Sequence, residues 1–300
     1  MQGMRLTAWL VLAATLVLWS GNWIVARAVR EDVAPGIATA GRLVIALAVL
    51  APFVLRDLAR KFRAFERRDW LVLLALALSG GGPHLALQWL GLHYTTATSA
   101  VLYLSTAPIF ILLLARPLLG EAIGPRQWIG VGVSFFGVAL IGSQGNFAAV
   151  TFNRGDLLAL ASMAMWGSYT VFLRMRRDAL AVPELLVAVC ALGLVFMLPW
   201  VAWELASGSR ITLSPAGALG VLYSALGSLL LAFAGWSYVV TRLGAARAGA
   251  TMHLMPAIGV GLAALFLGEY PRWYHFAGIA LILAGVALST FRGASASSSR

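Results

Sequence analysis

The chain has 300 residues, of which 61% are hydrophobic and only 11% are charged, and its mean hydropathy is +0.87. Soluble domains contain about 25% charged residues, so this composition excludes a water-soluble domain and a disordered chain. The single cysteine, Cys190, excludes an internal disulfide, and the net charge of +11 favours the basic loops of a membrane protein over a nucleic-acid-binding surface.

Ten segments are long and apolar enough to cross a bilayer, which takes about 20 apolar residues in a helix. They are apolar on all faces, whereas barrel strands would be about half as long and alternate in polarity. We therefore predict an all-α integral membrane protein with ten transmembrane helices. In chain order the predicted spans are Leu6–Ala26, Gly36–Leu55, Trp70–Leu92, Ala97–Leu119, Gln127–Ile141, Leu157–Leu173, Leu185–Trp203, Gly217–Thr241, Gly249–Leu267 and Trp273–Phe291.

The first predicted span could be mistaken for a signal peptide, because Arg5 precedes it and Ala26-Arg27-Ala28 follows it. Its apolar run is longer than a signal core and contains three large or polar residues, so we expect it to be retained. Trp19, Asn22 and Trp23 share one helix face at spacings of three and four residues.

Arg42 is the charged residue that lies clearly inside a predicted span, about seven residues from its outer end. It could pair with a substrate carboxylate, cap backbone carbonyls or extend its side chain toward the interface.

The third predicted span contains Gly80, Gly81, Gly82 and Pro83, which should bend or break a helix. This could be a hinge beside a substrate site or a tight crossing of small residues. His84 and Gln88 follow on one helix face, and polar groups at this depth are costly unless they line a cavity or find partners.

Further aromatic and polar residues fall at mid-depth in later spans, and they could line a cavity or simply pack. An aromatic wall with few charges would suit a ligand with an aromatic or apolar body. These residues are Tyr103, Trp166, Tyr169, Tyr223, Trp236 and His253, and Pro108 and Pro256 are further predicted bending points.

The distribution of basic residues predicts the orientation. One set of alternate loops and ends holds 16 Lys and Arg residues and the other holds five, which places both termini in the cytoplasm. Residues 293–300 read as a disordered Ser/Ala-rich tail.

The chain contains an internal repeat. Pro108–Leu140 and Pro256–Leu288 align without a gap at an offset of 148 residues, with 11 of 33 positions identical, including Glu121 and Glu269. We predict two five-helix halves, residues 1–148 and 149–292. Five is odd, so the second half must be inverted in the membrane, as in secondary transporters.

These motifs resemble the EamA-type family of the drug/metabolite transporter superfamily. Each half closes with Leu-Gly-Glu and a helix ending in Gly-Val-Ala-Leu, and Trp19–Trp23, Gly41-Arg42-Leu43 and Gly244–Ala248 are similar to other family patterns. Within the family, the chain resembles YddG-type exporters of aromatic amino acids and other metabolites. The resemblance implies an inner-membrane exporter with a central cavity and with peripheral fifth and tenth helices.

We therefore expect an alternating-access carrier that exports small metabolites, in particular aromatic or apolar amino acids. No acidic residue lies in mid-span, which favours a carrier without ion coupling, although His84 or His253 could carry protons. Drugs, nucleobases and other metabolites are alternative cargoes, and a channel is a more distant alternative. No metal-ligand spacing, catalytic motif or Walker sequence occurs, so we expect no enzyme activity, no cofactor and no nucleic-acid partner. The expected partners are a lipid bilayer and a small-molecule substrate.

Overall fold

The computed structural model describes residues 2–120, 124–147, 153–176, 178–209, 214–243 and 254–290. Helices make up nearly all of these ranges, and they contain no strand. The fold is therefore all-helical, as the sequence predicts. His253, one of the predicted site residues, lies outside the described ranges.

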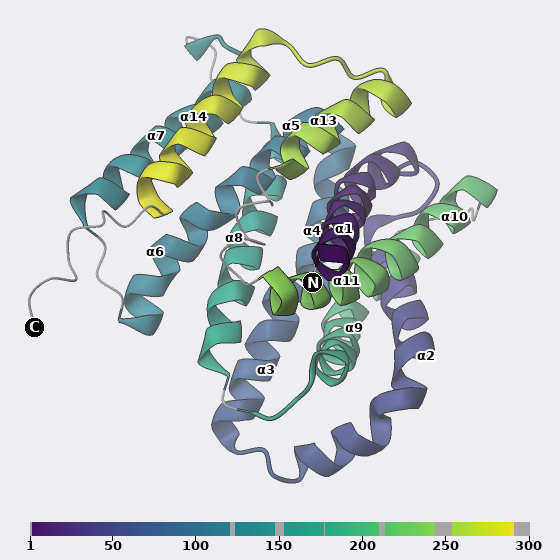
Figure 1. The fold of residues 1–300 in the computed structure, drawn as a ribbon. Coiled ribbons are helices and arrows are strands. Elements are labelled where there is room, and N and C mark those ends of the chain that lie inside the picture. The colour runs from purple at the N-terminus through teal and green to yellow at the C-terminus, as the bar shows by residue number, and fades with distance from the viewer. Residues whose placement is uncertain are drawn as a thin grey trace, which may run out of the picture.

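The first half of the chain forms long helices with two interruptions (Figure 1). In order, its elements are α1 (Gln2–Ala28), α2 (Pro35–Phe62), α3 (Arg67–Gly80), α4 (Gly82–Tyr94), α5 (Ala97–Tyr103), the 3-10 helix η1 (Leu104–Thr106), α6 (Ala107–Leu119) and α7 (Pro125–Gly142).

The second half is also mainly helical in its described ranges. It consists of α8 (Arg154–Met175), α9 (Val182–Ala206), α10 (Pro215–Tyr223), the π-helix η3 (Ser224–Leu231), α11 (Ala232–Leu243), α13 (Leu254–Leu267) and α14 (Trp273–Thr290).

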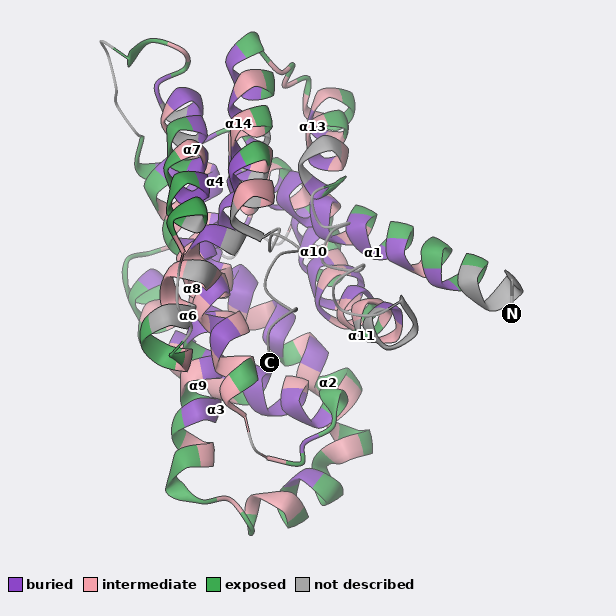
Figure 2. Ribbon diagram, turned by 60° about the vertical axis from the view of Figure 1, so that its left-hand side comes forward, coloured by how far each residue is buried: buried purple, intermediate pink, exposed green. Residues whose placement is uncertain are grey.

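Six helical segments of the described chain are long and apolar enough to cross a membrane: Leu6–Ala28, Pro35–Phe62, Arg67–Tyr94, Arg154–Met175, Val182–Ala206 and Pro215–Trp236. Shorter apolar helices cover Trp128–Ile141, Ile258–Leu267 and Trp273–Gly285. Large apolar side chains such as Phe53 and Leu265 are 81% and 75% exposed, and Figure 2 shows exposed and buried faces alternating along α1 and α2. Such exposure fits a surface in contact with lipid. The number of crossings stays a prediction.

The Leu-Gly-Glu motif of each half is a helix terminator. Gly120 follows α6 with φ of 70°, and Gly268 follows α13 with φ of 66°. A residue in the left-handed region just after a helix is a common C-terminal cap, and glycine adopts it without steric cost. The glycine of this motif therefore adopts the same backbone conformation in the two halves.

The helices α7 and α14 lie side by side at one edge of the molecule and cross in an antiparallel manner (Figure 1). A Cβ at Gly137 would lie 2.6 Å from the Gly278 carbonyl oxygen, and a Cβ at Gly285 would lie still closer to the Gly130 carbonyl oxygen. Ser134 donates a hydrogen bond of 3.1 Å to the Ile282 carbonyl midway between these contacts. The offset of 148 relates Ser134 to Ile282 and exchanges the two glycine contacts, so this crossing is symmetric with respect to the repeat.

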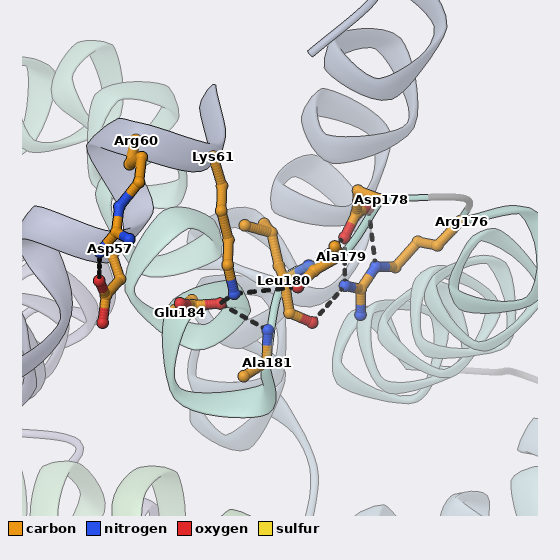
Figure 3. A network of polar contacts seen from close by, with 9 residues as sticks. All are labelled: Asp57, Arg60, Lys61, Arg176, Asp178, Ala179, Leu180, Ala181 and Glu184. Carbon is orange, nitrogen blue, oxygen red and sulfur yellow. Dashed lines mark hydrogen bonds and ion pairs between the residues drawn. The ribbon is translucent and has the colours of Figure 1, made fainter. Parts of the chain in front are cut away.

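The helices α2 and α9 form a second antiparallel pair, fixed by polar contacts at both ends. Near the start of α2, Glu204 of α9 accepts hydrogen bonds of 2.9 Å from the backbone N–H groups of Gly36 and Ile37. Near the end of α2, Lys61 lies 2.6 Å from the carboxylate of Glu184 (Figure 3).

The loop before α9 adds an ion pair to this network. Arg176 pairs with Asp178 and donates a 2.9 Å hydrogen bond to the Leu180 carbonyl (Figure 3). Burial alone would raise the pKa of Asp178, but hydrogen bonds from Arg176 and from the Leu180 N–H hold that pKa below its ordinary value. The carboxylate is therefore ionised at neutral pH and orders the turn into α9.

Candidate substrate site

A continuous row of aromatic rings connects four helices drawn from both halves of the chain. Trp236 of α11 lies 5.5 Å from Trp19 of α1, and Phe233 lies 5.6 Å from Trp19 and 6.2 Å from Trp166 of α8, measured between ring centroids. Trp166 in turn stacks on Tyr169 at 5.2 Å and on His84 of α4 at 5.6 Å. We call Trp19, His84, Trp166, Tyr169, Phe233 and Trp236 the aromatic row.

Polar side chains run beside this row. Ser224 of η3 donates a 2.7 Å hydrogen bond to the amide oxygen of Asn22, whose amide nitrogen lies 3.4 Å from the Gln88 amide oxygen. The indole N–H of Trp19 donates to the Ser228 carbonyl at 3.1 Å. These buried groups satisfy one another, which is the condition for keeping polar atoms at this depth.

The His84 ring has a fixed orientation. Its Nδ1 lies 2.9 Å from the backbone carbonyl oxygen of Ser162 and 3.0 Å from the hydroxyl of the same residue. Because the carbonyl can only accept, this contact favours the tautomer with the proton on Nδ1. The other ring nitrogen, Nε2, is then an acceptor in the neutral imidazole. Sequence reasoning placed His84 at the site, and the structure brings it into the aromatic row.

Irregular backbone lies beside the site in both halves. The third predicted span breaks at Gly81 between α3 and α4, and the eighth contains the π-helix η3. The offset of 148 carries Gly81 onto residue 229, inside η3. Interrupted helices at equivalent positions of two repeats are the best structural indication of a transporter's binding site.

The break at Gly81 is packed against α9. A Cβ at Gly82 would lie 2.5 Å from the Gly193 carbonyl oxygen, and a Cβ at Gly193 would lie 2.7 Å from the Gly82 nitrogen. A Cβ at Gly80 would collide with the ring of Tyr169. The glycines therefore permit a close helix crossing, and whether they also form a hinge stays a prediction. Pro108 lies in the first turn of α6, directly after the 3-10 helix η1, and Pro256 lies in the first turn of α13; their role as bending points stays a prediction.

Four other residues expected at the site are not members of the aromatic row. Trp23 packs in a different cluster of α1 with Trp89 and Met163. Tyr103 packs with Ile141, Ala159 and Ile282, and the Tyr223 hydroxyl donates to the Leu18 carbonyl at 2.9 Å. Arg42 is buried on α2, with its guanidinium carbon 5.7 Å from the centroid of the Trp89 ring.

A separate polar pocket of about 240 Å³ lies at the end of the bundle where α1 and α4 end and α8 begins. Arg27 lines it, lies 3.5 Å from Glu269 and donates to the Leu92 carbonyl at 2.5 Å. Asp156, which accepts a 2.6 Å hydrogen bond from Thr95, lines the same pocket. Arg27 thus connects α1, α4 and the segment after α13.

Sequence reasoning missed four residues that complete the site: Ser162, Ser224, Ser228 and Phe233. The spacing of Ser224 and Ser228 by four residues in an apolar span was the available signal. Across the described ranges, no group of three or more His, Cys, Asp or Glu side chains is placed to hold a metal ion.

The sequence pattern of the EamA-like transporter family matches the chain twice, over residues 6–143 and 153–291. A crystal structure of another protein superposes with a TM-score of 0.60 over 95% of this chain and 96% of its own, at 21% identity, which shows the fold alone.

Several relatives are similar over most of the chain. An uncharacterized transporter of Archaeoglobus fulgidus is 32% identical over 94% of this chain and 96% of its own. A probable terminal-alkyne amino-acid exporter of Streptantibioticus cattleyicolor is 28% identical over 92% and 91%. A probable amino-acid metabolite efflux pump of Salmonella typhimurium is 26% identical over 64% and 67%.

Proposed function

The chain belongs to the EamA-like transporter family, and we propose on this premise that it exports small metabolites with an aromatic or apolar body, amino acids first among them. Members of the family are transporters, and two of the relatives are named as an amino-acid exporter and an amino-acid metabolite efflux pump. The proposed location is a bacterial inner membrane, with ten crossings and both termini in the cytoplasm.

The observation that carries the proposal is the aromatic row and the polar side chains beside it. Indole and phenyl faces would hold the apolar body of a substrate, while Asn22, Gln88 and the imidazole of His84 offer hydrogen bonds to its polar end. The row draws on α1, α4, α8 and α11, so a substrate there would contact both halves of the chain. Exchange of conformation between the halves would expose it to one side and then to the other.

We further propose that transport requires no ion gradient, because no carboxylate occurs in the aromatic row. His84 is the residue of the aromatic row that could instead couple transport to a proton gradient. Its Nδ1 contacts the Ser162 carbonyl, so proton uptake would occur at Nε2.

Counterflow in proteoliposomes tests the proposal. We expect labelled phenylalanine to accumulate in vesicles preloaded with unlabelled aromatic or aliphatic amino acids, with saturation and with no response to a pH gradient. Counterflow that follows the pH gradient and loses that dependence in His84→Gln would support proton coupling instead. Folded protein that transports none of the amino acids would overturn the amino-acid proposal and leave the family membership intact.

A pair of tryptophan variants locates the site within the same assay. Trp19→Ala should raise the KM for counterflow about tenfold, equivalent to about 1.4 kcal/mol of lost binding. Trp203→Ala is the matched control, because Trp203 is 65% exposed on the outside of α9. Equal KM values for the two variants would remove Trp19 from the site.

A further inference from the structure

Arg42 is a buried cation, and two of its three guanidinium nitrogens lack acceptors among the described residues. The residue is 2% exposed, and within the described part of the chain neither its Nε nor its Nη2 has a hydrogen-bond partner. Its guanidinium carbon lies 5.7 Å from the centroid of the Trp89 ring, which is a cation–π contact. Buried charges in proteins are normally paired, because an unpaired one forfeits its hydration. An unpaired buried guanidinium of this kind is typical of a site that binds an anionic group of a ligand.

Two neighbouring donors share this condition. The indole N–H of Trp89, which is 2% exposed, and the hydroxyl of Thr39, which is fully buried, also lack partners in the described ranges. Thr39 lies three residues before Arg42 and therefore on the same face of α2. Of the five such buried atoms, four belong to these three residues, so the unsatisfied polar groups are concentrated between α2 and α4.

The described chain offers no anion to this cluster. Glu204, the acidic residue that contacts α2 nearest to Arg42, already accepts from Gly36, Ile37 and the Trp200 indole. The residue at the position equivalent to Arg42 in the second half is Cys190, which supplies no counter-charge when its thiol is protonated.

We propose that Arg42, the Trp89 indole N–H and the Thr39 hydroxyl bind the carboxylate group of the exported substrate. A guanidinium presents parallel donors that match the two oxygens of a carboxylate, and this planar geometry discriminates against neutral amides and amines. Gln88, the residue before Trp89 on α4, hydrogen-bonds to Asn22 beside the aromatic row, so one turn of α4 carries residues of both groups. The inference rests on the proposed function and narrows its cargo to carboxylate-bearing metabolites.

Ligand-induced thermal stabilisation of the purified full-length protein tests the site without relying on transport. The probes are hydrocinnamate and hydrocinnamamide, which share an aromatic body and differ only in the carboxylate. In chloride-free sulfate buffer we expect hydrocinnamate to raise the Tm of the wild type and hydrocinnamamide to do so far less. Trp89→Phe should weaken the apparent affinity for hydrocinnamate about tenfold, and Arg42→Gln should abolish the difference between the two probes.

Two controls separate binding from packing. Thr15→Val removes a hydroxyl that donates to its own helix at Val11, whereas Thr39→Val removes one of the proposed donors. Only Thr39→Val should weaken hydrocinnamate binding. Arg42→Met, without ligand, should have a Tm equal to or above that of the wild type, because it removes an unpaired buried charge, whereas a structural role for Arg42 predicts a lower Tm.

Equal Tm shifts from the two probes in the wild type, or a carboxylate preference retained in Arg42→Gln, would overturn the proposal. A chloride-induced shift as large as that from hydrocinnamate and lost in Arg42→Gln would assign the cluster to a halide and also overturn it. Counterflow measured on the same preparations distinguishes the two proposals. Amino-acid counterflow without carboxylate preference would refute this site alone, whereas carboxylate-specific stabilisation without counterflow would refute the proposed function alone.

Discussion

Glu204 shows how a single side chain joins two helices. The residue before α2 is Ala34, which has no side chain that can cap the first turn. Glu204 reaches across from α9, and its two carboxylate oxygens accept hydrogen bonds from Gly36, Ile37 and the Trp200 indole, each at 2.9 Å. A negative charge at a helix N-terminus is also favoured by the helix dipole.

Glu204→Gln should therefore lower the free energy of unfolding by about 1–3 kcal/mol, because an amide NH2 cannot accept and leaves one buried N–H of α2 without a partner. The measurement is thermal unfolding in detergent. Glu31→Gln is the control, since the Glu31 side chain is 76% exposed and pairs only at the surface with Arg30. A Tm loss in Glu31→Gln equal to that in Glu204→Gln would contradict the capping role.

At the level of single residues, periodicity predicted side chains that lie on regular helix faces. Trp19, Trp166 and His84 are predicted to line one site, and they lie in one aromatic row, with Phe233 between Trp19 and Trp166. Trp23 lies four residues after Trp19, yet it packs into another cluster, because two neighbouring helices cover adjacent parts of one face of α1. Depth in the membrane can be read from the sequence, whereas the neighbouring helix that a side chain meets depends on tertiary packing.

At the scale of elements, the close approach of α9 to the break between α3 and α4 can be tested. Gly82→Ala should lower stability by about 1–3 kcal/mol, because its Cβ would lie 2.5 Å from the Gly193 carbonyl oxygen. Gly261→Ala is the matched control on α13, since a Cβ there has no neighbour within 4 Å and should change stability by less than about 1 kcal/mol.

Comparing thermal unfolding with counterflow rates decides between the two interpretations of the glycine run. A Gly82→Ala protein that is less stable and slow supports a packed crossing that also limits transport. One that keeps wild-type stability but transports slowly would support a hinge and contradict the packing argument.

The elements differ in how far the sequence predicted them. Proline and glycine predicted the break at Gly81, because their backbone preferences are local. The π-helix η3, Ser224–Leu231, contains one glycine, Gly227, and no proline, which is a much weaker signal. It is associated with the contacts of Ser224 with Asn22 and of the Ser228 carbonyl with Trp19, which come from a distant part of the chain. Irregularity that depends on long-range contacts cannot be recognised from local composition.

At the scale of the whole molecule, the charge bias of the loops makes a prediction about sidedness. In a Cys190→Ser background, Glu31→Cys and Ser207→Cys should react with a membrane-impermeant maleimide on intact cells, and Arg63→Cys should react only after permeabilisation. Six predicted spans separate Glu31 from Ser207, so both should lie outside. Labelling of those two positions from opposite sides would contradict the predicted number of crossings.

The crossing of α7 and α14 has a consequence for the origin of the chain. Its contacts join Gly137 to Gly278, Gly130 to Gly285 and Ser134 to Ile282. The repeat offset of 148 converts the first of these contacts into the second and leaves the third unchanged. One helix surface thus recognises a copy of itself running in the opposite direction. An ancestral gene of half this length, whose product inserted in both orientations, could have formed the same crossing as a homodimer. Fusion of two copies would then have preserved an existing interface.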